Sequence, residues 1–253
     1  MTHFADKLTK MISQTNNPTV MGLDPVLDYV PESLRLQFTQ DHDNPSAAAA
    51  EVIWAFNQKL IDAVSDIIPA IKPQFAYYEM YGLDGIRTLY RTIEYARSKG
   101  MCVIADAKRN DIGSTASAYA KSILGKTKLT DGREYSMIDA DAVTLNAYLG
   151  WDGIAPFAEY LDQGKGMFIL VHTSNPSSVE VQELKLEDGR YMYEAMADHV
   201  SNWGRSTVGQ SGYSPVGAVV GATWPEQATR LRALMPHTFF LVPGYGAQGG
   251  DAS

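Results

Sequence analysis

Residues 101–111 have the sequence MCVIADAKRND, an apolar run followed directly by a cluster of charged residues. The apolar part, Met101–Ala105, is typical of a strand that is buried in a parallel sheet. The charged part begins at Asp106 and places Lys108 and Asp111 at or just beyond the end of that strand. This stretch therefore predicts a buried strand with a charged carboxyl end.

Helices are expected on either side of the strands. Before residue 101, apolar residues recur at helical spacing: Ile86, Leu89, Tyr90, Ile93 and Ala96. Gly100 stands where this helix should end, because glycine readily takes the left-handed conformation of a helix cap. A second stripe of the same spacing comprises Ile53, Phe56, Leu60, Val64 and Ile67. Thr223 and Glu226, with Pro225 between them, predict a capping box that opens a further helix.

The whole chain alternates between short apolar runs and helical segments, which is typical of an α/β fold with a parallel sheet. We expect seven strands, at Thr19–Asp24, Ala70–Phe75, Met101–Lys108, Ala142–Asn146, Met167–Thr173, Gly217–Thr223 and Phe239–Gly244. Seven strands in 253 residues favour a (β/α)₈ TIM barrel, although an open doubly wound sheet stays possible. We expect one domain, residues 1–253, that is incomplete at its C-terminus because the eighth strand and last helix are absent from the sequence.

Two segments interrupt the alternation, Gly125–Met137 and Asn175–Ser214, and both are interpreted as excursions between barrel elements. The second contains Asp188-Gly189, a pair that predicts a hairpin turn.

Composition excludes several classes of protein. The net charge is −8 and the basic residues form no run, so no nucleic-acid partner is expected. Apolar stretches such as Met167–Val171 are far shorter than the roughly 20 residues that span a bilayer, so no membrane partner is expected either. A single cysteine, Cys102, and the lack of a signal sequence in the first thirty residues predict a cytoplasmic protein. The spacing of the five histidines suggests no metal site.

The candidate catalytic residues lie at strand ends. Asp106 and Lys108 are two apart, so they should share one face of the strand and point into the mouth of a barrel. A carboxylate and a lysine at such a place either form a structural ion pair or take part in chemistry. Lys72 and Asp24 also follow apolar runs, so three consecutive strands deliver charge to the same edge.

Polar loops follow other strands. The glycine-rich residues 244–250 match GxGxxG only formally, and their place favours a phosphate site over a dinucleotide fold. Residues 173–178 (TSNPSS) and Asn146 offer hydroxyl and amide groups to a polar ring, or simply form turns.

Taken together, six segments resemble the orotidine 5′-phosphate decarboxylase family, most closely its longer subgroup. They are GLDP at 22–25, IKPQ at 71–74, DAKRNDIGST at 106–115, TSNP at 173–176, VVGAT at 219–223 and VPGYGAQGG at 242–250. The resemblance implies a phosphate-binding (β/α)₈ barrel that forms a homodimer with shared active sites and uses no metal or organic cofactor.

The resemblance also implies a role for each matching residue. The catalytic array would comprise Lys72, Asp106, Lys108 and Asp111. The substrate-binding residues would be Asp24, Ile112, Thr115, Ser174, Pro243, Gln248 and Gly249. Asp111, Ile112 and Thr115 would enter the neighbouring subunit's site. Asp24 and Lys72 would bind the ribose, and Ser174 would bind the pyrimidine. Gln248 and the backbone of its loop would bind the phosphate. An arginine expected to grip the phosphate is absent from the sequence.

The chemistry fits this array. Loss of CO₂ from the pyrimidine leaves a localised carbanion, which Lys108 could stabilise and protonate. A Schiff-base aldolase is a rival, but it needs a lysine of depressed pKa, whereas flanking carboxylates should raise the pKa of Lys108. A metal-assisted sugar-phosphate decarboxylase is a second rival, and a non-catalytic barrel that binds a phosphorylated ligand is a third.

Overall fold

The computed structural model describes residues 2–39 and 44–244. The chain divides into two compact units. The first, the N-terminal unit, comprises residues 8–107 and 121–143, and the second, the C-terminal unit, comprises residues 1–7, 108–120 and 144–253. Whether the chain is a single domain stays a prediction.

All seven predicted strands are confirmed in the described ranges. They are β1 (Val20–Leu23), β2 (Ala70–Pro73), β3 (Cys102–Arg109), β6 (Ala142–Leu145), β7 (Gly166–His172), β8 (Ser214–Val220) and β9 (Thr238–Leu241). Hydrogen bonding links them in the order β1-β2-β3-β6-β7-β8-β9, and the pairs β1–β2, β2–β3, β7–β8 and β8–β9 are parallel. The α/β class is therefore confirmed.

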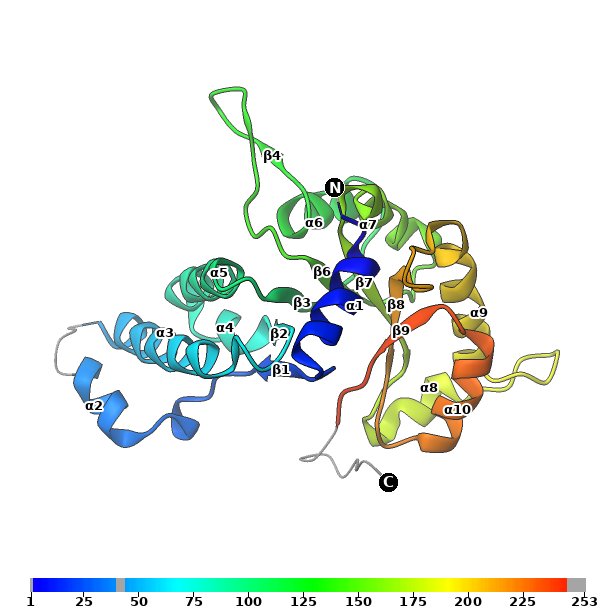
Figure 1. The fold of residues 1–253 in the computed structure, drawn as a ribbon, viewed down its shortest axis with the longest axis horizontal. Coiled ribbons are helices and arrows are strands. Elements are labelled where there is room, and N and C mark those ends of the chain that lie inside the picture. The colour runs from blue at the N-terminus through cyan, green and yellow to red at the C-terminus, as the bar shows by residue number, and fades with distance from the viewer. Residues whose placement is uncertain (1, 40–43, 245–253) are drawn as a thin grey trace. The chain divides into compact units, whose positions relative to one another are not determined.

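In the N-terminal unit, β1, β2 and β3 are accompanied by helices that follow or precede them in the chain (Figure 1). These are α2 (Glu32–Thr39), α3 (Pro45–Val64), α4 (Ala76–Glu79) and α5 (Gly82–Ser98), with a 3₁₀ turn, η1, at Leu27–Tyr29. Helix α1 (Phe4–Thr15) begins in the C-terminal unit and continues into this one. The excursion at 125–137 is confirmed as a hairpin of β4 (Thr127–Lys128) and β5 (Glu134–Tyr135).

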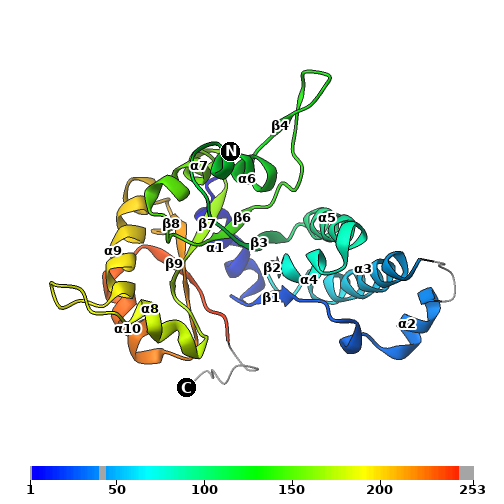
Figure 2. The same cartoon turned by 180° about the vertical axis from the view of Figure 1, so that it is seen from behind.

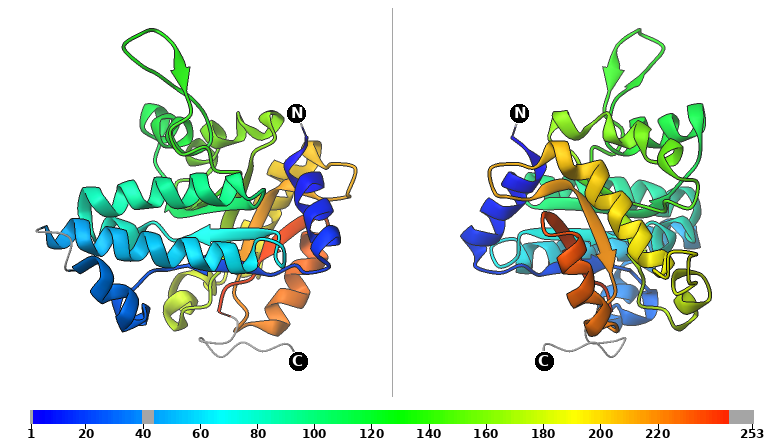
Figure 3. Two further views of the ribbon diagram at one scale, coloured as in Figure 1. Left: turned by 60° about the vertical axis from the view of Figure 1, so that its left-hand side comes forward. Right: turned by 90° about the vertical axis from the view of Figure 1, so that its right-hand side faces the viewer.

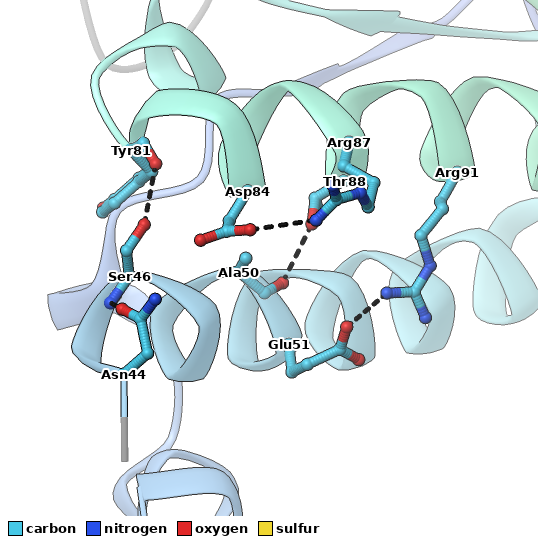
Figure 4. A network of polar contacts seen from close by, with 9 residues as sticks. All are labelled: Asn44, Ser46, Ala50, Glu51, Tyr81, Asp84, Arg87, Thr88 and Arg91. Atoms are coloured by element: carbon cyan, nitrogen blue, oxygen red, sulfur yellow. Dashed lines mark hydrogen bonds and ion pairs between the residues drawn. The ribbon is translucent and has the colours of Figure 1, made fainter. Parts of the chain in front are cut away.

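Helices α3 and α5 lie side by side (Figure 3) and are joined by polar contacts along their length (Figure 4). The Thr88 hydroxyl donates to the carbonyl of Ala50 at 3.2 Å, and Arg91 forms an ion pair with Glu51. At the start of α3, the Asn44 side chain accepts from the Ser46 amide, which caps the helix. These contacts fix the two helices that follow β1 and β2.

The predicted helical stripes are only partly correct. In α5, Leu89, Ile93 and Ala96 are buried, but Tyr90 is 36% exposed. In α3 the buried face is displaced: it carries Ala50, Ile53, Asn57 and Ile61, whereas Ile67 lies beyond the helix and is 52% exposed. Helix α5 packs against α3, and the hydrogen bond from Thr88 places it beside Ala50 on this buried face.

In the C-terminal unit, β8 and β9 lie beside α9 (Met192–Gly204) and α10 (Pro225–Leu234) (Figure 2). The other helices that lie in or extend from this unit are α6 (Gly113–Ile123), α7 (Ala155–Ala158) and α8 (Val179–Gln182). Short 3₁₀ turns occur at Trp151–Gly153 (η2), Leu161–Gln163 (η3), Pro176–Ser178 (η4) and Arg205–Thr207 (η5). Every residue of β8 is buried, as is typical of a strand inside a parallel sheet.

Two predictions for this unit need correction. The segment 175–214 is not only an excursion, because it contains the 13-residue helix α9, whose buried residues pack on β7 and β8. The hairpin at Asp188-Gly189 is confirmed by the pairing of Lys185 with Tyr191. The capping box is wrong: α10 begins at Pro225 after an N-cap without a side-chain bond, and the Thr223 hydroxyl donates to the carbonyl of Ser174 instead.

No helix in the described ranges is both long and apolar enough to cross a membrane.

Candidate active site

A buried ion pair joins the carboxyl ends of β2 and β3. The Nζ atom of Lys72 lies 2.7 Å from Oδ2 of Asp106, and the two side chains are only 15% and 7% exposed. The backbone fixes this geometry, because the amide of Phe75 donates to the carbonyl of Asp106 at 3.2 Å just beyond β2. Two residues that are 34 positions apart in the sequence are thus brought together by strand pairing, as predicted.

Asp24 follows β1, the strand that neighbours β2. The amide of Gln74 donates to the carbonyl of Leu23, so the chain positions before Asp24 and after Lys72 are hydrogen-bonded to each other. The Asp24 side chain is exposed and borders a pocket of about 250 Å³ whose wall includes Asn57 of α3. Asp24 therefore follows β1, and Lys72 and Asp106 lie in the second halves of β2 and β3, three adjacent strands of one unit.

A buried polar network lies next to that pocket. The Asn57 amide donates to the hydroxyls of Tyr78 and Thr92, at 2.9 and 3.1 Å. Burial raises the pKa of the Tyr78 phenol far above its ordinary value, and the nearby charge of Asp24 acts in the same direction. Tyr78 consequently stays neutral, and the network holds α3, α4 and α5 together behind the strand ends.

Lys108 has an unusual backbone conformation. Its φ angle is +46°, in the left-handed region, which costs a residue other than glycine, asparagine or aspartate about 1–2 kcal/mol. The amide of Lys108 donates to the hydroxyl of Thr144 in β6 at 3.0 Å, a contact that holds the strained backbone. Asp106 is buried and Lys108 is exposed, and the two residues belong to different units, so their common face stays a prediction.

Asp111, Ile112 and Thr115 lie where β3 gives way to α6. The Asp111 carboxylate accepts from the amide of Ile112 at 2.8 Å, which starts the turn into the helix. Ile112 is 55% exposed, and Thr115 is also exposed on the first turn of α6. This segment therefore presents an apolar and a hydroxyl side chain at the surface of the C-terminal unit.

Ser174 and Pro243 are both hydrogen-bonded to the segment that directly follows β8, residues 221–223. The Thr223 hydroxyl donates to the carbonyl of Ser174 at 3.3 Å, and the amide of Ala222 donates to the carbonyl of Pro243 at 2.9 Å. Gly221 makes this packing possible, because a Cβ there would lie 2.7 Å from the backbone N and Cα of Ser174. The structure thus brings together the predicted pyrimidine residue and the start of the glycine-rich loop. Gln248 and Gly249 lie outside the described residues.

Asn146, whose sequence position allows either a ligand-binding role or a turn, forms a turn in this structure. Its side chain accepts from the amide of Tyr148 at 3.0 Å, which closes a local turn after β6.

Several residues around the site are not evident from the sequence. Thr144 holds Lys108, Gln182 contacts Thr173, and His172 is fully buried at the end of β7. The only signal for Thr144 and His172 is a polar residue within or at the end of an otherwise apolar strand, as in AVTLN and FILVHT. Gln182 carries no signal, because its contact depends on the path of a segment that has no regular pattern.

Burial lowers the pKa of His172, and the neighbouring Glu183 carboxylate opposes that effect only in part. Nε2 of His172 lies 3.2 Å from Oε1 of Glu183, so the neutral ring carries its proton on Nε2.

In the part of the chain that the structure describes, no group of three or more histidine, cysteine, aspartate or glutamate side chains is arranged to hold a metal ion.

The chain is similar to known proteins over nearly its whole length. The family model of the orotidine 5′-phosphate decarboxylase / HUMPS family matches residues 41–253. Orotidine 5′-phosphate decarboxylase from Rhodopirellula baltica is 43% identical over 253 residues, which is 100% of this chain and 81% of that protein. The enzyme of the same name from Caldicellulosiruptor saccharolyticus is 41% identical over 99% of this chain and 82% of its own length.

A solved structure of Leishmania donovani OMP decarboxylase is similar in fold as well as in sequence. The TM-score is 0.72 and the identity 32%, over 97% of this chain and 81% of that one. The chain therefore has the α/β fold of that enzyme, and it belongs to the orotidine 5′-phosphate decarboxylase / HUMPS family.

Proposed function

We propose that this chain decarboxylates orotidine 5′-phosphate to uridine 5′-phosphate, a step of pyrimidine nucleotide biosynthesis. The observation that carries the proposal is the buried pair of Lys72 and Asp106 at adjacent strand ends, with Lys108 two residues further along. Relatives that are more than 40% identical over nearly the whole chain bear the name of this activity.

Lys108 is the proton donor in this proposal. Departure of CO₂ leaves an electron pair on C6 of the pyrimidine, in the plane of the ring, where no carbonyl can delocalise it. An ammonium group stabilises that charge electrostatically and then transfers a proton to the same carbon. The exposed side chain of Lys108 is accessible to a substrate.

Lys72, Asp106 and Asp111 complete the catalytic array. Asp106 is buried and already paired with Lys72, so this part of the array is held in place before substrate binds.

Substrate contacts are proposed along the same strand ends. Asp24 and Lys72 would bind the ribose hydroxyls, Ser174 the pyrimidine, and the backbone near Pro243 with Gln248 and Gly249 the phosphate. The proximity of Ser174 and Pro243 to the one segment after β8 supports a nucleotide that extends from the β7 loop toward the β9 loop.

A homodimer with shared sites is part of the proposal. Asp111, Ile112 and Thr115 would reach the partner's substrate, and the surface exposure of Ile112 and Thr115 is compatible with that role. The cytoplasm is the proposed compartment, since Cys102 is a buried free thiol that suits reducing conditions.

The activity is tested by following the ultraviolet absorbance of orotidine 5′-phosphate as it is converted to uridine 5′-phosphate. The wild-type chain should show turnover, and Lys108→Ala should lose it by about a thousandfold or more while keeping its circular dichroism spectrum. Lys121→Ala, an exposed lysine on α6, is the matched control and should behave as wild type. Near-normal turnover of Lys108→Ala would refute the mechanism.

The shared site is tested with subunit mixing. Lys108→Ala and Asp111→Ala should each be inactive, whereas their mixture should regain activity, because one site of a hybrid dimer carries neither change. A mixture as inactive as its parents would exclude a site built from two subunits.

A further inference from the structure

The turn that presents Ser174 is held at the preceding residue, Thr173. The amide of Thr173 donates to Oε1 of Gln182 at 2.8 Å, and its carbonyl accepts from the indole of Trp224 at 2.9 Å. Its hydroxyl accepts from Nε2 of Gln182 at 2.9 Å and donates to Oδ1 of Asn175 at 2.7 Å. Each polar group of Thr173 therefore has a partner, which leaves the backbone before Ser174 little freedom to rotate.

Gln182 supplies two of these four contacts from the last residue of α8. Its carbonyl oxygen faces an amide and its amino group faces a hydroxyl, so both ends of the side chain bind one residue. A shift of the turn along or away from α8 would break both bonds together. Gln182 lies far from the catalytic lysines in sequence and is not itself a member of the proposed catalytic array.

The residue after Gln182 contacts the residue before Thr173. Glu183 lies 3.2 Å from Nε2 of His172, the last residue of β7. Two consecutive residues of the α8 segment thus bind two consecutive residues at the end of the strand. This doubled contact fixes the direction in which the chain leaves β7.

The other side of the turn is supported by aromatic packing. The buried ring of His172 lies edge to face with Trp224 and Tyr193, with centroids 5.1 and 4.7 Å apart. Trp224 is the same side chain that donates to the carbonyl of Thr173. The indole is therefore oriented by packing and not only by its single hydrogen bond.

From this arrangement we propose that Gln182 is a positioning residue for recognition of the pyrimidine. It fixes Thr173 and, through it, the Ser174 groups that would bind the donor and acceptor edge of the base. The inference depends on the proposed function, since it assumes that Ser174 contacts a pyrimidine nucleotide. Its consequence is selective: loss of Gln182 should weaken recognition of the base and leave recognition of the sugar and phosphate intact.

The test uses Gln182→Met, which preserves side-chain length and removes both hydrogen bonds. We expect kcat/KM for orotidine 5′-phosphate to fall about tenfold, the effect of about 1.4 kcal/mol. The inhibition constant of uridine 5′-phosphate should rise by a similar factor, and that of ribose 5-phosphate, which has no base, should not change. Glu180→Gln, on the exposed face of the same helix, is the control and should match wild type.

Thr173→Val provides an independent variant with an unchanged backbone amide. It removes the hydroxyl that accepts from Nε2 of Gln182 and leaves the contact with Oε1 in place. We expect a smaller loss, about threefold, again confined to ligands with a base. Adding Gln182→Met to Thr173→Val should cost less than the product of the separate effects.

Two results would overturn the inference. One is an unchanged inhibition constant for uridine 5′-phosphate in both folded variants. The other is an equal loss for uridine 5′-phosphate and ribose 5-phosphate, which would indicate general disruption of the site. Failure of the proposed function is distinguishable, because the wild-type chain itself would then show neither turnover nor inhibition by uridine 5′-phosphate.

Discussion

Removing the charge of Lys72 should destabilise the protein strongly even without substrate. In Lys72→Met the aliphatic stem is retained, but the ammonium group that lies 2.7 Å from Asp106 is lost. The Asp106 side chain is only 7% exposed, so water cannot replace the lost partner easily. Removal of one partner from a buried ion pair costs about 3–5 kcal/mol, and we expect a loss near the lower limit because Lys72 is itself 15% exposed.

The measurement is urea unfolding of the ligand-free protein, followed by circular dichroism, for a complete double-variant cycle. Asp106→Asn alone should cost less than Lys72→Met, because the amide removes a buried negative charge and leaves the more exposed lysine unpaired. The double variant Lys72→Met/Asp106→Asn should be more stable than Lys72→Met by itself, since it no longer buries a carboxylate that has lost its lysine partner at 2.7 Å. The coupling free energy should be about 2 kcal/mol.

Additive effects would refute this reasoning. If the cost of the double variant equals the sum of the single costs within about 0.5 kcal/mol, the two groups do not interact in solution. The pair could then not pre-organise the catalytic array. Loss of activity in the same variants would not decide the question, because both residues are also proposed to act in catalysis.

Three further outcomes are expected. In urea titrations, the free energy of unfolding of Lys108→Gly should be about 1 kcal/mol larger than that of Lys108→Ala, because glycine tolerates the φ angle of +46° and alanine does not. Equal free energies of unfolding would contradict a left-handed backbone at Lys108. Between pH 7 and pH 5 the free energy of unfolding should fall, because burial lowers the folded-state pKa of His172 below its unfolded value and protons then favour the unfolded chain. The contribution of neutral His172 to the free energy of unfolding is fully present above the unfolded pKa and is lost as the pH falls toward the folded pKa. The free energy of unfolding of His172→Phe, which keeps the ring packing, should therefore fall less over this range. An identical pH profile for the two proteins would contradict the lowered pKa of His172. Gly221→Ala should raise the inhibition constant of uridine 5′-phosphate about tenfold or more, since a Cβ would meet the Ser174 backbone at 2.7 Å; an unchanged constant would show that the turn can move without loss of binding.

The strands could be predicted well from the sequence because each is a largely apolar run, and the parallel sheet buries most of β2, β3, β6, β7 and β8. The apolar run before Asp106 gives way to charged residues in the second half of β3, and the run before His172 ends with β7, so strand position and site position come from the same signal. The pairing of Lys72 with Asp106 follows from this, since parallel neighbours bring their carboxyl ends to the same edge.

The remaining features depend on interactions that have no short-range pattern. The sequence does not predict the left-handed backbone of Lys108, which the hydroxyl of Thr144 in another strand stabilises. Helix α9 is hard to predict because it begins directly after the hairpin around Asp188, whose sequence shows no helical pattern. Thr223 stands where a capping box predicts an N-cap, but its hydroxyl donates to the carbonyl of Ser174, 49 positions away in the sequence.

Three features of this chain carry a free-energy cost in the folded state, and each lies near the carboxyl end of a strand. They are the desolvated ion pair of Lys72 and Asp106, the left-handed backbone of Lys108, and the buried His172 with its lowered pKa. Asn16 and Asp139 also have positive φ angles, but these residue types tolerate that conformation, whereas lysine does not. Selection for stability alone would remove such features or scatter them along the strands. In (β/α)₈ enzymes the active site is built from the carboxyl ends of strands, so the place of each feature in its own strand is a physical argument for catalysis that does not depend on the sequence motifs.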